Sequence, residues 1–460
     1  MSLEFSSLVG VNLPIYRASH EGQTLYYAPG FLAGVDQSLS GSLELNLATR
    51  DRRSCDEPEI LQISRKLRAA SKAAVQAWRD TLTAPFKPLC LTLYPHNDCN
   101  LACTYCYAEA GPSHGGELLS LEAVRSACAL VAGNCKLEDR PLVIVFHGGG
   151  EPSLHFSWLE QALEIVEGTA AQSQVEVFRY IATNGVMSEE KAGWLAKRFD
   201  LIGLSCDGPE AIQTAQRPRG DHNPTTPGVE RTARIVRQFG KPLNIRVTIT
   251  PASLHRQSEI VDYLCETFRL QEIRVEPVYR GGRATQESVF QPAQAAEFVD
   301  EFMKARRHAR DLGVGWQTSG SRLGEVHGPY CHILRAVLLL VPGEGASICF
   351  KSCDASQAER EGFGIGSYDD SDRKIHLREE AITRLQHTLM DRHDDCAGCF
   401  NQYHCTRACP DACLLTDNRS EGDFRCQVQK LLSSALLEEA ATQHANGRRT
   451  WHVSLLAKDQ

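Results

Sequence analysis

The sequence has 460 residues, of which 42% are hydrophobic and 23% charged, so it is not that of a disordered, collagen-like or coiled-coil protein. Asp and Glu outnumber Lys and Arg by 57 to 49, and the net charge of −8 disfavours a nucleic acid as the main partner. No apolar run approaches the ~18–20 residues of a membrane span, and no signal peptide is visible at the N-terminus. We therefore expect a cytoplasmic protein without a membrane partner.

Residues 1–85 are expected to form an N-terminal α+β extension. Two short aromatic and apolar stretches within 16–35, separated by turn-forming glycines, predict a hairpin. Apolar residues then recur at helical spacing after Pro58, which predicts a helix over 57–80.

Residues 86–315 alternate between strand and helix patterns. The expected strands cover 89–94, 142–146, 175–182, 201–205, 243–250 and 273–277. The expected helices cover 120–133, 157–169, 188–199, 228–239, 256–268 and 293–312. Nearly continuous apolar strands that alternate with helices predict an α/β fold, a parallel sheet with helices outside it. Six such units fit either an open doubly wound sheet or an incomplete barrel, and both bind ligands at the carboxyl ends of their strands.

The rest of the chain divides into a cysteine-rich region and a tail. Residues 316–430 show turns and cysteines rather than a strand or helix rhythm. A helix is expected near 428–443, and residues 431–460 would supply the end of this helix and a short tail.

Eighteen cysteines in a chain expected to be cytoplasmic indicate metal binding or catalysis rather than disulfides. Three of them, Cys99, Cys103 and Cys106, follow the first strand with the spacing C-x3-C-x2-C. A closed structural zinc site has four protein ligands, and a cubane [4Fe–4S] cluster normally has four cysteines. Three thiolates leave one iron of a cluster open to a small molecule. The alternative is a zinc site completed by His96 or His114.

This spacing resembles that of the radical S-adenosylmethionine (SAM) family, and the resemblance implies a SAM-binding [4Fe–4S] cluster within a partial (β/α)6 barrel. It places Tyr105, which precedes the third cysteine, near the SAM adenine. Polar and glycine residues at the ends of later strands match the family's other SAM contacts. By this resemblance the cofactor-binding residues are Tyr105, Gly149, Gly150, Glu151, Thr183, Asn184, Ser205, Asp207 and Arg246.

The second cysteine region resembles the SPASM extension, which binds two auxiliary [4Fe–4S] clusters. Carried over by position, the distal cluster would be held by Cys396, Cys399, Cys405 and Cys426. The proximal cluster would be held by Cys331, Cys349 and Cys409. The usual further ligand shortly after Cys331 is missing, so Cys353 is expected to replace it, unless that iron is open or Cys413 serves. The alternative for this region is a pair of zinc ribbons.

The resemblance also implies an activity: a 5′-deoxyadenosyl radical, made from SAM with one electron, abstracts a hydrogen atom from a substrate. SPASM-type members mostly modify peptides, and auxiliary clusters suit a net oxidation. The expected enzyme is an oxidoreductase that forms a thioether or C–C crosslink in a ribosomally made precursor peptide, with flavodoxin or ferredoxin as electron donor. Residues 1–85 would dock a leader segment or cap the barrel.

Two alternatives remain open from the sequence. One is a sulfatase-type maturase that oxidises a protein Cys or Ser to formylglycine. The other is a non-enzymatic zinc-binding or electron-carrier protein, which would not need the ordered residues at the strand ends. No catalytic base is singled out, because Asp, Glu and Tyr residues are too numerous to choose among.

Overall fold

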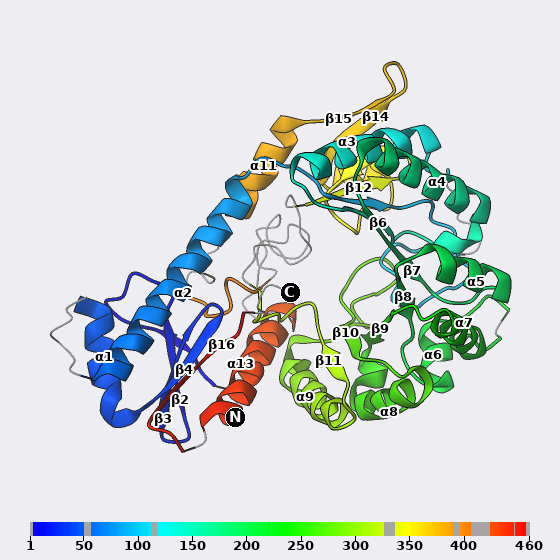
Figure 1. Cartoon of the computed structure of the whole chain (residues 1–460). Helices are drawn as coiled ribbons and strands as arrows, with labels where there is room; N and C mark the ends of the chain where they lie inside the picture. Colours follow the sequence, from blue (N-terminus) through cyan, green and yellow to red (C-terminus); the bar gives the residue numbers. More distant parts are fainter. Residues whose placement is uncertain are drawn as a thin grey trace.

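The computed structural model describes residues 3–49, 57–111, 117–221, 223–325, 336–390, 396, 398–405, 424–445 and 447–456. They form two sheets, one built mainly by the N-terminal residues and one by the barrel (Figure 1). None of the helices in these residues is long and apolar enough to cross a membrane.

The N-terminal sheet is antiparallel, with the strand order β1-β2-β3-β4-β16. Its strands are β1 (Ser6–Ser7), β2 (Tyr16–His20), β3 (Gln23–Ala28), β4 (Phe31–Asp36) and β16 (Thr450–Ser454). Helices α1 (Gln37–Thr49) and α2 (Pro58–Thr83) follow it. The expected hairpin and the expected helix are thus both present. The sheet is buried on both faces, because alternate residues of β3 enter two different cores.

The barrel sheet begins with six parallel strands, each at or within two residues of its expected position. They are β5 (Cys90–Leu93), β6 (Leu142–Phe146), β7 (Val177–Thr183), β8 (Leu201–Ser205), β9 (Leu243–Ile249) and β10 (Glu272–Pro277). Two further parallel strands extend the sheet: β11 (Gly315–Gln317) beside β10, and β12 (Val337–Val341) beside β5. The expected partial barrel is confirmed, with a longer sheet than six units would give.

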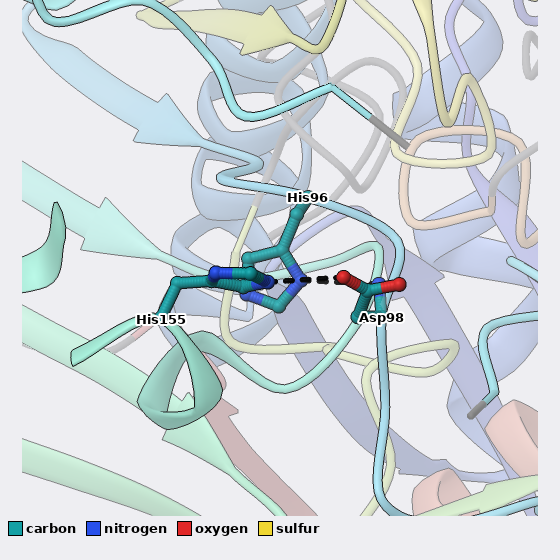
Figure 2. Close-up of side chains that lie close together, drawn as sticks. All are labelled: His96, Asp98 and His155. Atoms are coloured by element: carbon teal, nitrogen blue, oxygen red, sulfur yellow. Dashed lines mark hydrogen bonds and ion pairs between the residues drawn. The ribbon is translucent and has the colours of Figure 1, made fainter. Parts of the chain in front are cut away.

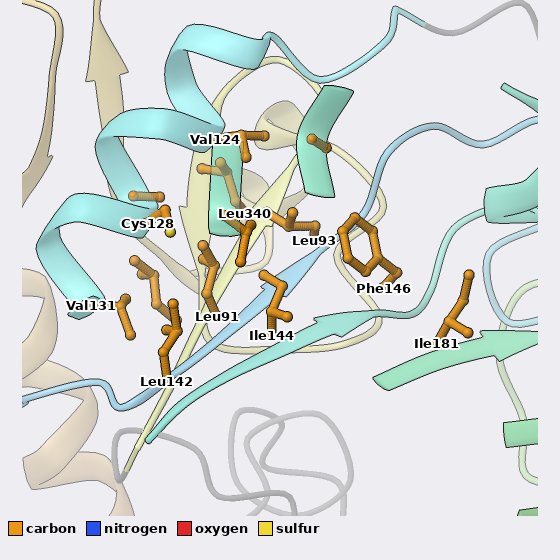
Figure 3. Packing of buried hydrophobic residues seen from close by; sticks show 14 of the residues in the cluster. Leu91, Leu93, Val124, Cys128, Val131, Leu142, Ile144, Phe146, Ile181 and Leu340 are labelled. Carbon is orange, nitrogen blue, oxygen red and sulfur yellow. The ribbon is translucent and has the colours of Figure 1, made fainter. Parts of the chain in front are cut away.

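Helices cover the outside of the barrel strands (Figure 1). They are α3 (Leu121–Leu137), α4 (Phe156–Ser173), α5 (Glu189–Arg198), α6 (Glu210–Gln216), α7 (Thr226–Gln238), α8 (Gln257–Phe268) and α9 (Ala295–Asp311). Short 3-10 turns lie at η2 (Pro152–Leu154), η3 (Pro251–Arg256) and η4 (Pro292–Gln294). Figure 3 shows the packing of α3 on the strands, where Leu91, Ile144, Leu340 and Cys128 are fully buried. This apolar layer fixes the strands whose carboxyl ends carry the site.

Regular structure continues through much of the region that the sequence showed only as turns and cysteines. After β12 come β13 (Gly345–Ser347), β14 (Gly364–Asp369) and β15 (Lys374–Leu377), which join the barrel sheet by antiparallel pairing. Helices α10 (Ala355–Arg360), α11 (Glu379–Met390) and α13 (Phe424–Ala445) accompany them. The long helix α2 reaches from the N-terminal sheet to α11 (Figure 1), where Gln386 Nε2 donates to Ala84 O at 3.0 Å.

Strand pairing differs from the expected division of the chain in two places. Strand β12 belongs to the barrel sheet rather than to a separate cysteine-rich domain, because it pairs with β5 in parallel. Strand β16 lies in the expected C-terminal tail but completes the N-terminal sheet beside β4. The two ends of the chain therefore fold together.

Candidate functional site

The first cysteine group lies on the loop between β5 and α3, at the carboxyl end of the barrel strands. The thiol groups are close enough for Cys103 and Cys106 to raise the pKa of Cys99, although burial is the larger cause and brings it to about 12. Among the described residues, this trio is not one whose ligand atoms all lie within 4.8 Å of one another. A single zinc ion would draw its sulfur ligands to about 3.8 Å, given Zn–S bonds of about 2.3 Å. At least one pair of these sulfur atoms is thus farther apart than two sulfur ligands of one zinc ion would be.

Arg283 holds the cysteine loop from the end of β10. Its guanidinium donates to the carbonyl oxygens of Cys103 at 2.7 Å, Ala110 at 2.8 Å and Glu109 at 2.9 Å. The preceding Gly282 has φ +53°, and a Cβ there would lie 2.3 Å from the carbonyl oxygen of Cys106. Sequence reasoning missed Arg283, although the segment Gly281-Gly282-Arg283, in the loop after the sixth strand, was a usable signal.

The glycine turn after β6 packs against the same loop. The Gly150 amide donates to the His96 carbonyl oxygen at 2.8 Å. A Cβ on Gly150 would lie 1.8 Å from the carbonyl oxygen of Asp98, and one on Gly149 would lie 2.5 Å from that of His96. Glycine is required at both positions because the two backbones touch. The structure thus brings the predicted residues Gly149 and Gly150 directly against the cysteine loop.

Glu151 connects this turn to the end of β7 and to Cys99. Its carboxylate is 2% exposed and accepts hydrogen bonds from the Thr183 hydroxyl at 2.8 Å and the Asn184 amide N–H at 2.7 Å. Burial raises the pKa of Glu151, and these donors act in the opposite direction. The Asn184 side chain in turn points its Nδ2 at Cys99 Sγ, at 3.7 Å. Three predicted residues therefore form one chain of contacts that ends at a cysteine sulfur.

Asp207 is the centre of a second buried network, at the end of β8. Its Oδ2 accepts hydrogen bonds from Tyr105 Oη at 2.5 Å, Gln216 Nε2 at 2.8 Å and Arg217 Nε at 3.0 Å. Its Oδ1 accepts one from the Thr248 amide at 2.9 Å. Four donors thus surround this carboxylate, three at Oδ2 and one at Oδ1. Asp207 therefore anchors the cysteine loop through Tyr105, and its predicted contact with SAM stays a prediction.

Arg246 on β9 presents a positive charge beside the site. Its NH1 lies 2.9 Å from His147 Nε2, and its guanidinium lies over the Tyr180 ring at 5.9 Å. Burial and the nearby guanidinium lower the pKa of His147 to about 3, so this ring is neutral and accepts the hydrogen bond. Arg246 makes no ion pair with any described residue, which leaves its charge available for a carboxylate. Its neighbour in the sheet register is the predicted residue Ser205.

His96, Asp98 and His155 lie close together (Figure 2), with the spacing of a metal site. His96 Nδ1, however, already accepts a hydrogen bond from the Asp98 amide at 3.0 Å, so its lone pair is engaged. His155 Nε2 lies 3.0 Å from Asp98 Oδ2 and links the loop to the helical turn after the glycines. The group fastens two loops together, which disfavours His96 as the fourth zinc ligand. His114 lies outside the described residues.

The proposed distal cysteines gather around one end of α13. Burial acts to lower the pKa of Lys430, but the nearby thiols of Cys426, Cys399, Cys396 and Cys405 outweigh it and raise the pKa. As with the first group, no three of these sulfurs lie within 4.8 Å of one another. Four cysteines are the number of ligands that a [4Fe–4S] cluster normally has, and their role as ligands stays a prediction.

The proposed proximal site is described only in part, because Cys331, Cys409 and Cys413 lie outside the described residues. Cys349 packs in the main barrel core, whereas Cys353 belongs to a small cluster with Ala108 and Ala110, against which Cys99 and Cys106 pack. Cys353 also borders a cavity of about 780 Å³, which Asn97 and Tyr107 line as well. Its role as a cluster ligand stays a prediction.

Comparisons with known proteins agree with this geometry. Residues 93–264 match the family model of the radical SAM superfamily. An uncharacterised protein of Methanocaldococcus jannaschii is 27% identical over 175 residues, which cover 38% of this chain and 57% of that protein. A cysteine-type anaerobic sulfatase-maturating enzyme of Clostridium perfringens is 26% identical over 192 residues, or 39% of this chain and 49% of that protein. The solved structure of native anSMEcpe with bound AdoMet and Cp18Cys peptide has a TM-score of 0.58 at 18% identity, covering 77% of this chain and 99% of that one.

Residues 93–264 therefore form a radical SAM domain, the domain of a class of enzymes that use SAM and a [4Fe–4S] cluster. The chain spans only 49–57% of the length of the two curated relatives described above. The similarity to the solved structure extends the shared fold beyond this domain, to about three quarters of the chain.

Proposed function

We propose that this protein is a radical SAM peptide maturase that oxidatively crosslinks a ribosomally made peptide. Cys99, Cys103 and Cys106 would hold the SAM-binding cluster, which when bound supplies the electron that cleaves SAM to a 5′-deoxyadenosyl radical. Arg246 would bind the carboxylate of SAM. Tyr105, fixed by Asp207, would shape the adenine side of the pocket, and Asn184 would donate a hydrogen bond to the cluster through Cys99.

The observation that carries the proposal is the linkage of four strand ends to one cysteine loop. Gly150 after β6, Asn184 after β7, Asp207 after β8 and Arg283 after β10 all contact that loop or a residue on it. A zinc-binding or electron-carrier protein does not need a loop oriented from so many strand ends. A site that must bind a cluster and a second molecule at its open iron does need such an orientation.

The first prediction concerns the three loop cysteines. The triple variant Cys99→Ala, Cys103→Ala, Cys106→Ala should lose about four of about twelve irons per reconstituted chain. It should form no 5′-deoxyadenosine from SAM and dithionite. Cys265→Ala, a half-buried cysteine on α8, is the control and should keep both properties. Undiminished 5′-deoxyadenosine formation by the triple variant would overturn the proposal, as would zinc in place of iron in the wild-type protein.

Different observations support the proposed auxiliary clusters and the proposed peptide substrate. The four distal thiols converge on Lys430, and a protein of similar fold is known with a peptide bound. Auxiliary clusters at this position would accept an electron from the substrate radical, which suits a crosslink that removes two hydrogen atoms. The external electron donor would be a flavodoxin or ferredoxin.

A sulfatase-type maturase is the second candidate, favoured by the similarity to the Clostridium perfringens enzyme. The two functions differ in their product. Incubation of the reconstituted protein with SAM, reductant and the Cp18Cys peptide should leave that peptide unchanged by mass spectrometry if our proposal is correct. Conversion of its cysteine to formylglycine would establish the second candidate instead.

A further inference from the structure

Strand β3 places two neighbouring tyrosines on opposite faces of the N-terminal sheet. Tyr26 faces the core beneath α1, where its hydroxyl donates to Glu44 Oε1 at 2.9 Å. Tyr27 faces the other way and reaches His404, with 2.6 Å between Tyr27 Oη and His404 Nε2. Both tyrosines and His404 are fully buried. The N-terminal sheet therefore contacts the distal loop, residues 398–405, through a buried polar pair.

The hydrogen bonds of His404 have a fixed direction. Its Nδ1 lies 2.6 Å from the Glu325 carbonyl oxygen and 3.2 Å from that of Arg322, and since carbonyls only accept, Nδ1 carries the proton. His404 Nε2 therefore accepts the Tyr27 hydroxyl proton. One imidazole thus joins the N-terminal sheet to the segment that contains Arg322 and Glu325.

Other contacts seat the same loop on the sheet. Gln402 Nε2 donates to Tyr16 Oη at 2.5 Å, and the Phe400 ring packs against Phe5 and Tyr27, with centroids 4.9 and 6.2 Å away. The thiol of Cys399 is close enough to act on the pKa of Tyr27, though burial is the main cause of its rise. Phe400, Gln402 and His404 of the distal loop therefore all contact residues of β2 or β3.

We propose that the N-terminal sheet is a structural part of the distal cluster site, with Tyr27 and His404 as positioning residues for the Cys399–Cys405 loop. This inference rests on the proposed distal cluster. The ligands Cys399 and Cys405 flank His404, so the hydrogen bonds of its ring set the path of the loop between them. Partners that orient metal ligands typically change metal affinity by about 10–100-fold when removed.

The test compares Tyr27→Phe with Tyr26→Phe, a matched control on the same strand. Each variant loses one buried hydroxyl and keeps its ring, but only Tyr27 faces the distal loop. Iron release from the reconstituted, full-length protein would be followed against increasing chelator concentration. We expect about four irons of the Tyr27→Phe protein to be released at about 10-fold lower chelator concentration than in the wild type. The Tyr26→Phe protein should release iron as the wild type does.

A second variant distinguishes the loss of the Tyr27–His404 hydrogen bond from a general destabilisation of the protein. His404→Asn keeps a donor for the Glu325 carbonyl but cannot reach Tyr27, so it should match Tyr27→Phe, and the double variant should be no worse than either. The EPR spectrum of the reduced protein should change in one cluster signal while 5′-deoxyadenosine formation persists. Equal iron release from the Tyr26→Phe and Tyr27→Phe proteins would overturn the inference. If no iron binds outside the first cysteine group, the proposed distal cluster itself fails.

Discussion

At the scale of single residues, buried polar side chains join the candidate site into one unit. Asp207 shows this most clearly, because its carboxylate is 0% exposed and faces the guanidinium of Arg217, whose Nε lies 3.0 Å away. The Arg217 guanidinium also lies over the Tyr105 ring, at 5.3 Å from the ring centre. Tyr105 is thus held in place by the hydrogen bond from its hydroxyl to Asp207 and by the Arg217 guanidinium over its ring. A buried pair of this kind is costly to break on one side, because the remaining charge is left without compensation.

Replacement of Asp207 by Asn should therefore destabilise the protein and loosen the cysteine loop. The amide keeps the size of the side chain but leaves the Arg217 charge unpaired, and we expect a loss of about 3–5 kcal/mol in the free energy of unfolding. Asp221→Asn removes an exposed carboxylate that lies 2.8 Å from Arg219, and should cost no more than about 1 kcal/mol. Denaturant unfolding of both variants would measure these losses in the free energy of unfolding. Similar losses for the two would contradict the role given to Asp207.

At the scale of elements, the six barrel strands and their helices followed from the sequence because each strand is a short apolar run followed by an amphipathic helix. Strand β12 was not recognised, although Val337–Val341 is as apolar as any of them. No helical pattern follows it, so the alternation that marks a parallel strand is missing. The glycines after β6 were recognised from a motif, but the reason for them is tertiary: Gly149 and Gly150 lie against the backbone of a distant loop.

Arginine contacts within the site were harder to predict for a similar reason. Arg283 donates to the carbonyl oxygen of Cys103, which lies more than 100 positions away in the sequence. Arg217 donates to the buried carboxylate of Asp207 at the preceding strand end. The hydrophobic periodicity of the local sequence does not indicate such partners. The cysteine positions were predictable because a cluster needs several thiols at short spacing, whereas an arginine that supports them can come from any strand end.

At the scale of the whole molecule, the two chain ends form one layer beside the barrel (Figure 1). Helix α13 carries Cys426 in its first turn and, about three turns further on, apolar residues such as Leu437, which pack with Tyr27 and Trp451 in one core. Strand β16 then pairs with β4 over five residues. Deletion of residues 1–85 would leave α13 and β16 without this core. Point variants are therefore the better means of testing whether the N-terminal sheet docks a peptide.

Trp451 on β16 is the residue that should reveal this coupling between the chain ends. It is 5% exposed, its Nε1 donates to Gln23 Oε1 at 2.7 Å, and its ring occupies the space over Gly34, where a Cβ would lie 2.2 Å from Nε1. Trp451→Ala should cost about 3–5 kcal/mol of unfolding free energy. Because β4 pairs with β3, the loosened sheet should also release the distal irons at lower chelator concentration.

The matched control is Val453→Ala on the same strand, since this side chain is half-buried and smaller. It should cost at most about 1.5 kcal/mol and leave iron release unchanged. Formation of 5′-deoxyadenosine should persist in both variants, because the first cysteine loop is held by β6, β7, β8 and β10 rather than by the N-terminal sheet. A Trp451→Ala protein that is destabilised but keeps wild-type iron release would show that the sheet and the distal loop are independent. Loss of SAM cleavage in that variant would show instead that the N-terminal sheet also supports the barrel.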